Sequence, residues 1–459
     1  MSAAPILIAG AGLAGSLLAA QLASRGYVVA MMERRGDIRR EHMIAGRSIN
    51  LALAERGFEG LRRAGAIDSV REYLLPMRGR MLHDRAGANL FQPYGLASNE
   101  VIWSVHRGRL NQTLLDLAAN AGARIRFHAR MESVDFDQRI AYFVDDENGA
   151  RWNEEFEVLI GADGAGSALR AAIDATQSAP SHTEFLDHGY KELRIPPDAR
   201  GEFSLSPDAL HIWPRGGFML IALPNPDHSF TATLFLANAG DDSFATLNSD
   251  ATVDAFFTRE FADVFALVPD LLQQFHANPT GLLGTLHSEH WCHLDRALLI
   301  GDAAHAIVPF HGQGMNCAFE DCVSLLDRIE SARAQLTTET QALPWAQIFE
   351  AFEVDRRPNA QAIAQMALEN YVEMRDAVAD PAYQLRRRLE LELARRLPGQ
   401  FIPRYSMVMF HRIPYVEAQE RGRRQLALLI EFTTAAQAWE DIDLEAATER
   451  ARQTLAPLM

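Results

Sequence analysis

Glycines and a carboxylate near the start of the chain stand at a spacing that can support binding chemistry. Gly10, Gly12 and Gly15 follow an apolar run at residues 6–9, and Glu33 ends the next apolar run. In a strand–turn–helix unit, the first glycine permits a tight turn, the second lets the backbone approach a pyrophosphate, and the third lets the helix pack closely. A carboxylate at the end of the second strand can bind a ribose diol. The pattern therefore predicts a dinucleotide site.

Two further segments place an acidic residue beside glycine after an apolar run. Asp163 follows the run at residues 156–160, and Asp302 follows the run at residues 297–300. A dinucleotide site needs only the N-terminal segment. We therefore expect a longer cofactor that reaches all three segments.

The loop after Asp302 is suited to a flavin. Asp302 can accept a hydrogen bond from a ribityl hydroxyl. Gly312 and Gly314 can expose backbone N–H groups where a helix is expected to start near Asn316. The positive end of such a helix can stabilise negative charge on a flavin pyrimidine ring. The three segments together favour FAD over NAD.

The elements that must position these residues alternate between strand and helix in the first third of the chain. Between residues 176 and 275, strand-like runs are separated by turn residues. After Asn316 the pattern is helical, with breaks expected at prolines such as Pro358. We predict an α/β fold: an FAD-binding Rossmann-like domain of the glutathione-reductase type, an inserted antiparallel β-sheet substrate domain, and a C-terminal helical region.

The expected boundaries divide the chain into three parts. The FAD-binding domain is expected to comprise residues 1–75, 100–178 and 276–370, the substrate-binding sheet residues 76–99 and 179–275, and the helical region residues 371–459. We expect the helical region to cover the substrate pocket and to close over it without being needed to hold FAD.

Composition excludes several classes of function. The chain has 459 residues, of which 48% are hydrophobic, and a net charge of −16, which argues against a nucleic-acid partner. Three cysteines without zinc spacing fit a reducing cytoplasm and predict no metal site. No apolar stretch is long enough to span a membrane, so we expect no membrane partner. The oligomeric state is left open, a homodimer included.

The three glycine–acid segments resemble those of the group A FAD-dependent aromatic hydroxylases. Four longer sequence motifs are similar to those of the kynurenine-hydroxylating branch of that family. They are RSINLAL at 47–53, HGYKEL at 188–193, LHIWP at 210–214 and NYVEM at 370–374. The resemblance runs from residue 5 to about residue 415. Eukaryotic members carry a C-terminal membrane anchor that this chain lacks, so it resembles the soluble bacterial form.

The resemblance implies a reaction. L-kynurenine would be hydroxylated at ring position 3 during tryptophan degradation, with non-covalent FAD, NADPH as a transient co-substrate, and O₂ reacting through a flavin C4a-hydroperoxide. No side chain need act as catalytic acid or base, and we expect His311 and Pro309 only to shape the pocket. The alternatives are a hydroxylase of a simple phenol or benzoate, an FAD-dependent dehydrogenase that does not use O₂, and a non-catalytic flavoprotein sensor.

The resemblance also implies which residues bind the ligands. A buried substrate carboxylate needs a fixed cation, and a guanidinium suits it through two parallel hydrogen bonds. Arg80 matches the carboxylate anchor of the family and Tyr94 its hydroxyl partner. The further expected substrate contacts are Asn370, Glu373, Tyr405 and Phe235. The expected cofactor contacts are Gly10, Gly12, Leu13, Ala14, Gly15, Glu33, Arg34, Arg47, Ala52, Arg107, Asp163, Asp302, Gly312, Gly314, Met315 and Asn316. Lys191, the only lysine, has no role that the sequence indicates.

Overall fold

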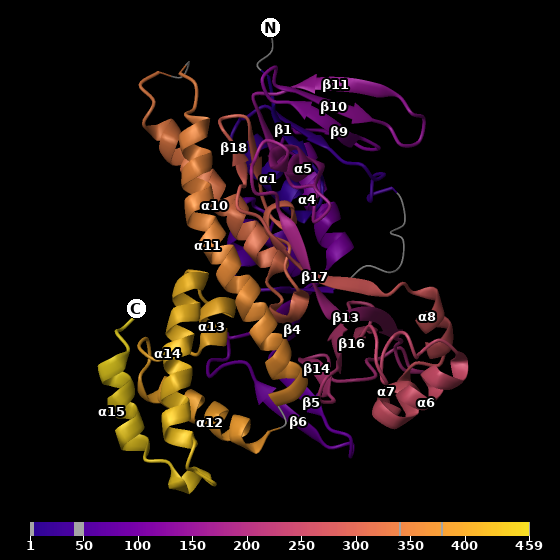
Figure 1. The fold of residues 1–459 in the computed structure, drawn as a ribbon, viewed down its shortest axis with the longest axis vertical. Coiled ribbons are helices and arrows are strands. Elements are labelled where there is room, and N and C mark those ends of the chain that lie inside the picture. The colour runs from indigo at the N-terminus through magenta and orange to yellow at the C-terminus, as the bar shows by residue number, and fades with distance from the viewer. Residues whose placement is uncertain (1–3, 41–49, 339–340, 378–379, 459) are drawn as a thin grey trace.

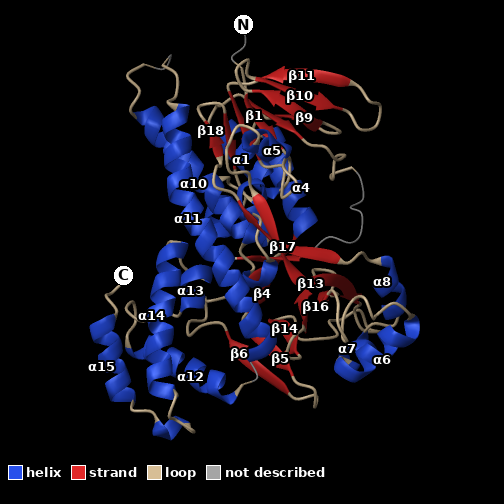
Figure 2. Cartoon of the chain, in the orientation of Figure 1, coloured by secondary structure: helices blue, strands red, loops and turns tan. Residues whose placement is uncertain are grey.

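The computed structural model describes residues 4–40, 50–338, 341–377 and 380–458. Two large sheets lie one beyond the other along the long axis of the molecule, and the C-terminal helices pack to one side (Figure 1). The strands and helices are separated by colour in Figure 2. Both sheets and the C-terminal helices are joined by the long helix α11 (Trp345–Val372).

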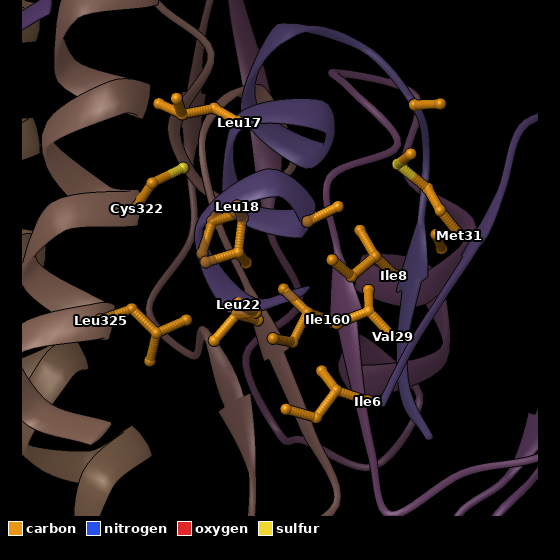
Figure 3. Packing of buried hydrophobic residues seen from close by; sticks show 14 of the residues in the cluster. Ile6, Ile8, Leu17, Leu18, Leu22, Val29, Met31, Ile160, Cys322 and Leu325 are labelled. Atoms are coloured by element: carbon orange, nitrogen blue, oxygen red, sulfur yellow. The ribbon is translucent and has the colours of Figure 1, made fainter. Parts of the chain in front are cut away.

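The first sheet has six strands in the order β18-β19-β12-β1-β2-β8, and all neighbours are parallel except β18 and β19. Its central strands are fully buried, because several helices and the segment at residues 129–143 pack with them in one hydrophobic cluster. In Figure 3, leucines of α1 lie between these strands and Cys322 and Leu325 of α10. The strands are β1 (Ile6–Ala9), β2 (Val29–Met32), β8 (Arg124–Arg126), β12 (Val158–Gly161), β18 (Cys292–His293) and β19 (Ala297–Leu299). The helices are α1 (Leu13–Ala23), α2 (Glu55–Arg63), α3 (Ile67–Arg71), α4 (Arg107–Asn120), α5 (Ala168–Asp174), α9 (Asp302–His305) and α10 (Gly314–Ala334).

Two small antiparallel sheets flank this core. One has the order β3-β7-β4, and the other, β11-β10-β9, forms a meander at the edge of the molecule (Figure 1). Their strands are β3 (Asn50–Leu53), β4 (Leu75–Met77), β7 (Ile102–His106), β9 (Arg130–Asp135), β10 (Ile140–Val144) and β11 (Arg151–Glu155).

The second large sheet has seven strands in the order β17-β13-β16-β15-β14-β5-β6. They are β5 (Gly79–His83), β6 (Asn89–Pro93), β13 (His182–Ile195), β14 (Ala209–Pro214), β15 (Met219–Pro224), β16 (Phe230–Ala237) and β17 (Gly281–His287). The helices α6 (Asp250–Glu260), α7 (Ala262–Leu267) and α8 (Leu271–Ala277) pack phenylalanines against it.

This sheet differs from the expected one in two ways. It is mixed rather than antiparallel, because β14 pairs in parallel with β5, a strand that arrives from far earlier in the chain. It also extends beyond the expected boundary at residue 275, since β17 pairs with β13. Pairing between distant strands is set by tertiary packing, which local turn patterns do not report.

Lys191 on β13 has a structural role that the sequence did not indicate. Its side chain is buried, and Nζ donates to the carbonyl oxygens of Phe275 at 2.8 Å and Asn278 at 2.7 Å. The ammonium also lies 4.6 Å from the Phe275 ring centroid. Lys191 thus satisfies carbonyls at the C-terminal end of α8, where positive charge is favoured. Burial lowers the pKa of this ammonium.

The expected break at Pro358 is wrong, because α11 continues through it. A proline inside a helix removes one backbone hydrogen bond. Phe352 and Ile363 are buried on either side of it, so tertiary packing holds the helix together. Asn359 Nδ2 also donates to the carbonyl of Asp355 at 2.9 Å.

The C-terminal region forms its own small hydrophobic cluster around Leu389, Leu393, Phe401 and Leu428. A π-helical segment, η2 (Glu373–Ala377), follows α11 directly. The remaining elements are α12 (Pro381–Arg396), α13 (Arg404–Met409), α14 (Tyr415–Thr433), η3 (Trp439–Asp441) and α15 (Leu444–Thr454). Within the described ranges, no helix combines the length and apolar character that crossing a bilayer would require.

Candidate active site

The order of the six-stranded sheet brings the separated glycine–acid segments to one edge. Strands β19, β12, β1 and β2 are adjacent and parallel, so their carboxyl ends lie side by side. These ends lead into Asp302, Asp163, Gly10 and Glu33, respectively. Ligands of open parallel sheets bind at this edge.

The glycine turn has the geometry that its spacing predicts. Gly10 has φ +99°, and a Cβ there would lie 2.4 Å from the carbonyl oxygen of Ala162. A Cβ on Gly15 would lie 2.0 Å from the carbonyl oxygen of Gly10. A Cβ on Gly12 would meet nothing within 4 Å. The protein therefore uses the space at Gly10 and Gly15 itself and leaves the space at Gly12 for a ligand.

The three carboxylates at this edge differ in environment. Glu33 is buried, and burial opposes its charge, but hydrogen bonds from Arg35 and from the Ala11 N–H, at 2.8 Å, hold its pKa below the usual value. Burial raises the pKa of Asp163, whose Oδ2 accepts from the Ala168 N–H at 2.8 Å while Oδ1 is buried without a partner in the described part of the chain. Asp302 is exposed. An unpartnered buried carboxylate oxygen fits a site that takes a hydroxyl-bearing cofactor.

The loop between α9 and α10 starts with a short 3-10 helix, η1 (Pro309–His311), and turns at Gly312, which has φ +64°. Asn316 fixes the loop: its Nδ2 donates to the carbonyls of Ala52 and Gly312, both at 2.8 Å, and its Oδ1 accepts from the Ala54 N–H at 2.9 Å. The Asn316 side chain is thus engaged with the backbone, which leaves its own backbone N–H as the group for a cofactor. Met315 is buried beside it.

The other expected cofactor residues lie around the same edge. Leu13 and Ala14 open α1 and are partly buried, and Arg34 is exposed directly after Glu33. Arg107 is the first residue of α4 and is partly exposed. Arg47 lies outside the described residues.

Five of the expected substrate and pocket residues meet between β5 and the C-terminal region. Arg80 is 7% exposed, and its guanidinium carbon lies 4.8 Å from the centroid of the Tyr405 ring. Tyr405 stacks on Tyr94 at 5.5 Å and on His311 at 5.3 Å between ring centroids. Glu373, in the π-helical segment, places Oε1 3.7 Å from Arg80 Nη1. Segments distant in sequence thus meet in one polar and aromatic cluster, where the substrate pocket is expected.

Three polar atoms in this pocket are buried and have no partner among the described residues: Arg80 Nε, Tyr94 Oη and His311 Nδ1. Burial lowers the pKa of His311 to about 3, so its ring is neutral at ordinary pH. Arg80 keeps its charge, since Tyr405, Tyr383 and Glu373 outweigh the effect of burial and raise its pKa. A fixed cation beside an unpaired hydroxyl can bind an anionic oxygen-rich group.

Asn370 and Phe235 lie on the loop side of this pocket. Asn370 Nδ2 donates to the carbonyl of Phe310 at 2.6 Å, and Phe235 lies 4.9 Å from the Phe310 ring. Phe310 in turn stacks on Tyr371 at 3.8 Å. Pro309 is exposed. In this structure, Asn370 therefore contacts the loop, and its expected contact with substrate stays a prediction.

Two pocket residues were missed from the sequence. The Tyr383 hydroxyl donates to Glu373 Oε1 at 2.7 Å, and Arg387 Nη2 donates to the carbonyl of Tyr94 at 2.9 Å. Both lie on α12, whose sequence is rich in Arg and Glu. Such a composition is typical of a solvated helix, so only the tertiary position of α12 reveals them.

Known proteins match the chain over most of its length. Residues 3–367 match the model of the FAD binding domain family. The kynurenine 3-monooxygenase of Stenotrophomonas maltophilia (strain K279a) is 54% identical over 436 residues, which cover 95% of this chain and 94% of the relative. The chain belongs to the kynurenine 3-monooxygenase family. A second member, from Xanthomonas axonopodis pv. citri (strain 306), is 51% identical over 99% of this chain and 97% of its own length.

Solved structures outside the kynurenine 3-monooxygenase family share the fold at low identity. The tetrameric form of 2-methyl-3-hydroxypyridine-5-carboxylic acid oxygenase has a TM-score of 0.65 at 19% identity, over 83% of this chain and 95% of that one. PqsL of P. aeruginosa, in complex with 2-aminobenzoylacetate, has a TM-score of 0.63 at 18% identity, over 81% and 97%. The predicted α/β fold with an FAD-binding domain is confirmed.

Proposed function

We propose that this protein hydroxylates L-kynurenine to 3-hydroxykynurenine with FAD, NADPH and O₂. The proposal is supported by the kynurenine 3-monooxygenases that are 51–54% identical over nearly the whole chain. The observation within the structure that carries it is the buried Arg80, whose Nε lacks a partner among the described residues beside the unpaired hydroxyl of Tyr94. Kynurenine brings a carboxylate that can satisfy both groups.

The pocket residues would bind and orient this substrate. Arg80 and Tyr94 would hold the carboxylate, and Glu373, 3.7 Å from Arg80, would face the α-ammonium. His311 and Phe235 would bound the aromatic ring, and the buried walls would keep water out. FAD, when bound, supplies the oxygen-activating chemistry. The protein's contribution would be orientation and exclusion of water rather than proton transfer by a side chain.

The open turn at Gly12, the unpartnered Asp163 Oδ1 and the N-terminal end of α10 fit FAD. They would hold the pyrophosphate, a hydroxyl group and the flavin ring, respectively. Arg107 and Arg34 would add positive charge at the cofactor edge.

Product identification tests the proposal. The purified protein, loaded with FAD, is given L-kynurenine and NADPH, and the products and oxygen uptake are measured. We expect 3-hydroxykynurenine, with one O₂ consumed per NADPH. Hydroxylation of a benzoate or phenol but not of kynurenine would assign a related hydroxylase. Substrate oxidation without O₂ uptake would assign a dehydrogenase, and no turnover with any substrate would indicate a flavoprotein sensor.

The proposal extends to how NADPH binds, where the protein is located in the cell, and whether it forms a dimer. NADPH would bind transiently, because the glycine pattern for a dinucleotide occurs only once in the sequence. The cysteines Cys292, Cys317 and Cys322 are all free, which fits a cytoplasmic protein. A homodimer is retained as one arrangement to be tested by light scattering.

A further inference from the structure

Gln313 stands directly before α10, at the loop that the cofactor is expected to meet, and its side chain is fully buried. Two residues of the C-terminal region hold it. The Tyr415 hydroxyl donates to Gln313 Oε1 at 2.7 Å, and Gln313 Nε2 lies 2.9 Å from the Met409 sulfur. These contacts tie the C-terminal region to the loop before α10 as well as to the expected substrate pocket.

Tyr415 is itself held by charge. It is fully buried at the start of α14, and the guanidinium of Arg56 lies 3.9 Å from its ring centroid. Arg56 forms an ion pair with Glu320 on α10 and donates to the carbonyl of Ile413. The ring is therefore fixed between α2, α10 and the C-terminal region.

Glu320 also links this cluster to the segment at Gly301 and Asp302, the other segment that is expected to bind the cofactor. Arg356 on α11 pairs with Glu320 at 2.8 Å and with Asp321 at 2.8 Å. Asp321 Oδ2 accepts from the Gly301 N–H at 2.9 Å and contacts His305 Nε2 at 2.6 Å. Gly301 directly precedes Asp302. One buried network of ion pairs and hydrogen bonds thus contacts both the Gly301–Asp302 turn and the loop before α10.

We propose that Tyr415 is a positioning residue for the flavin loop. Through Gln313 it sets the position of the N-terminal end of α10, so docking of the C-terminal region is coupled to the electronic environment of the cofactor. The inference rests on the proposed function for its turnover readout, but not for its readouts on bound FAD. A loosened helix end would stabilise negative charge on reduced flavin less well.

Tyr415→Phe is the test, because it removes one hydroxyl and keeps both the ring and its contact with Arg56. Tyr73→Phe is the matched control: Tyr73 is also buried, its hydroxyl bonds Thr113 at 2.9 Å, and the Arg109 guanidinium lies 4.2 Å from its ring. Met409→Leu is a second test variant, since it removes the sulfur beside Gln313 at nearly constant volume.

Three quantities are measured on FAD-loaded protein: the absorbance spectrum, the reduction potential of the flavin, and the peroxide released per NADPH with kynurenine present. We expect Tyr415→Phe to give an altered spectrum, a more negative potential and roughly a tenfold loss of coupled product, since a small misplacement of reacting groups is costly. The KM for kynurenine should stay near that of the wild type. Met409→Leu should shift the same quantities in the same direction.

A spectrum, potential and coupling equal to those of Tyr73→Phe would overturn the proposal, whatever happens to the melting temperature, because a merely structural tyrosine changes stability alone. If the wild type does not hydroxylate kynurenine, the proposed function fails, and the spectrum and potential still decide the role of Tyr415.

Discussion

A methyl group placed on Gly12 would meet no protein atom within 4 Å, whereas one on Gly15 would lie 2.0 Å from the Gly10 carbonyl oxygen. Gly12 also has φ −72°, which any residue can adopt. We therefore expect Gly12→Val to fold normally but to bind no FAD, and Gly15→Ala to lose at least about 1–3 kcal/mol of stability by overpacking. Thermal unfolding of the FAD-free proteins and a flavin titration separate the two effects. Normal FAD affinity in Gly12→Val would place the pyrophosphate elsewhere.

The side chain of Arg80 should matter for substrate and not for cofactor. Arg80→Ala would leave a substrate carboxylate buried and unpaired, which costs on the order of 2–5 kcal/mol and should appear as a steep rise in KM. Arg80→Lys should rescue poorly, since an ammonium lacks the planar fork. The exposed neighbour Arg78 supplies the control, Arg78→Ala, which should behave as wild type. Kynurenine titrations would show an unchanged affinity in Arg80→Ala if the site were misplaced.

At the scale of elements, α12 should act as a cover for the pocket. It supplies Tyr383 and Arg387, and Leu393 anchors it in the C-terminal cluster. Leu393→Ala should destabilise this cluster by about 2–5 kcal/mol. Because the mutation lies away from the glycine turn, we expect FAD to stay bound while more NADPH is consumed with release of peroxide. Hydrogen exchange on α12 and a peroxide assay provide the measurement, and unchanged coupling despite faster exchange would argue against a covering role.

The elements also show which parts of the structure the sequence could predict. The sequence predicts the glycine turn, because Gly10, Gly12 and Gly15 each have a local reason to lack a side chain. It also predicts four strands from short apolar runs, namely β1, β2, β12 and β19. Three features could not be predicted: the pairing of β14 with β5, the continuation of α11 through Pro358, and the hydrogen bond from Tyr415 to Gln313. These depend on contacts between distant segments, and a single sequence carries no local pattern for them.

For the whole molecule, buried neutral imidazoles predict sensitivity to acid. Burial, aided by His211, lowers the pKa of His83 from 6.5 to about 4. Between these two values, His83 is protonated in the unfolded chain and neutral in the folded chain. The contribution of His83 to the free energy of unfolding, about 3 kcal/mol, is therefore intact above pH 6.5 and is lost as the pH falls towards 4. His305 works in the opposite direction, because Asp321 overcomes burial and raises its pKa, which favours the folded state below pH 6.5.

His83→Gln isolates this effect. The free energy of unfolding, measured from pH 7 to pH 4.5 in the wild type and the variant, should fall more steeply in the wild type. Parallel curves would mean that His83 remains neutral in the unfolded chain or is solvated in the folded one, and the pH argument would fail.

The position of Lys191 has a practical consequence. Every other basic side chain among the 44 lysines and arginines is an arginine, so the one lysine amine is the buried ammonium between β13 and α8. Lysine-directed acylating reagents and cross-linkers, which usually map protein surfaces, would find no lysine on the folded exterior. Acylation at Lys191 would instead require α8 to separate from the sheet. The rate of that single modification, followed by mass spectrometry, would report the opening of this edge of the molecule, a motion otherwise hidden from surface labelling.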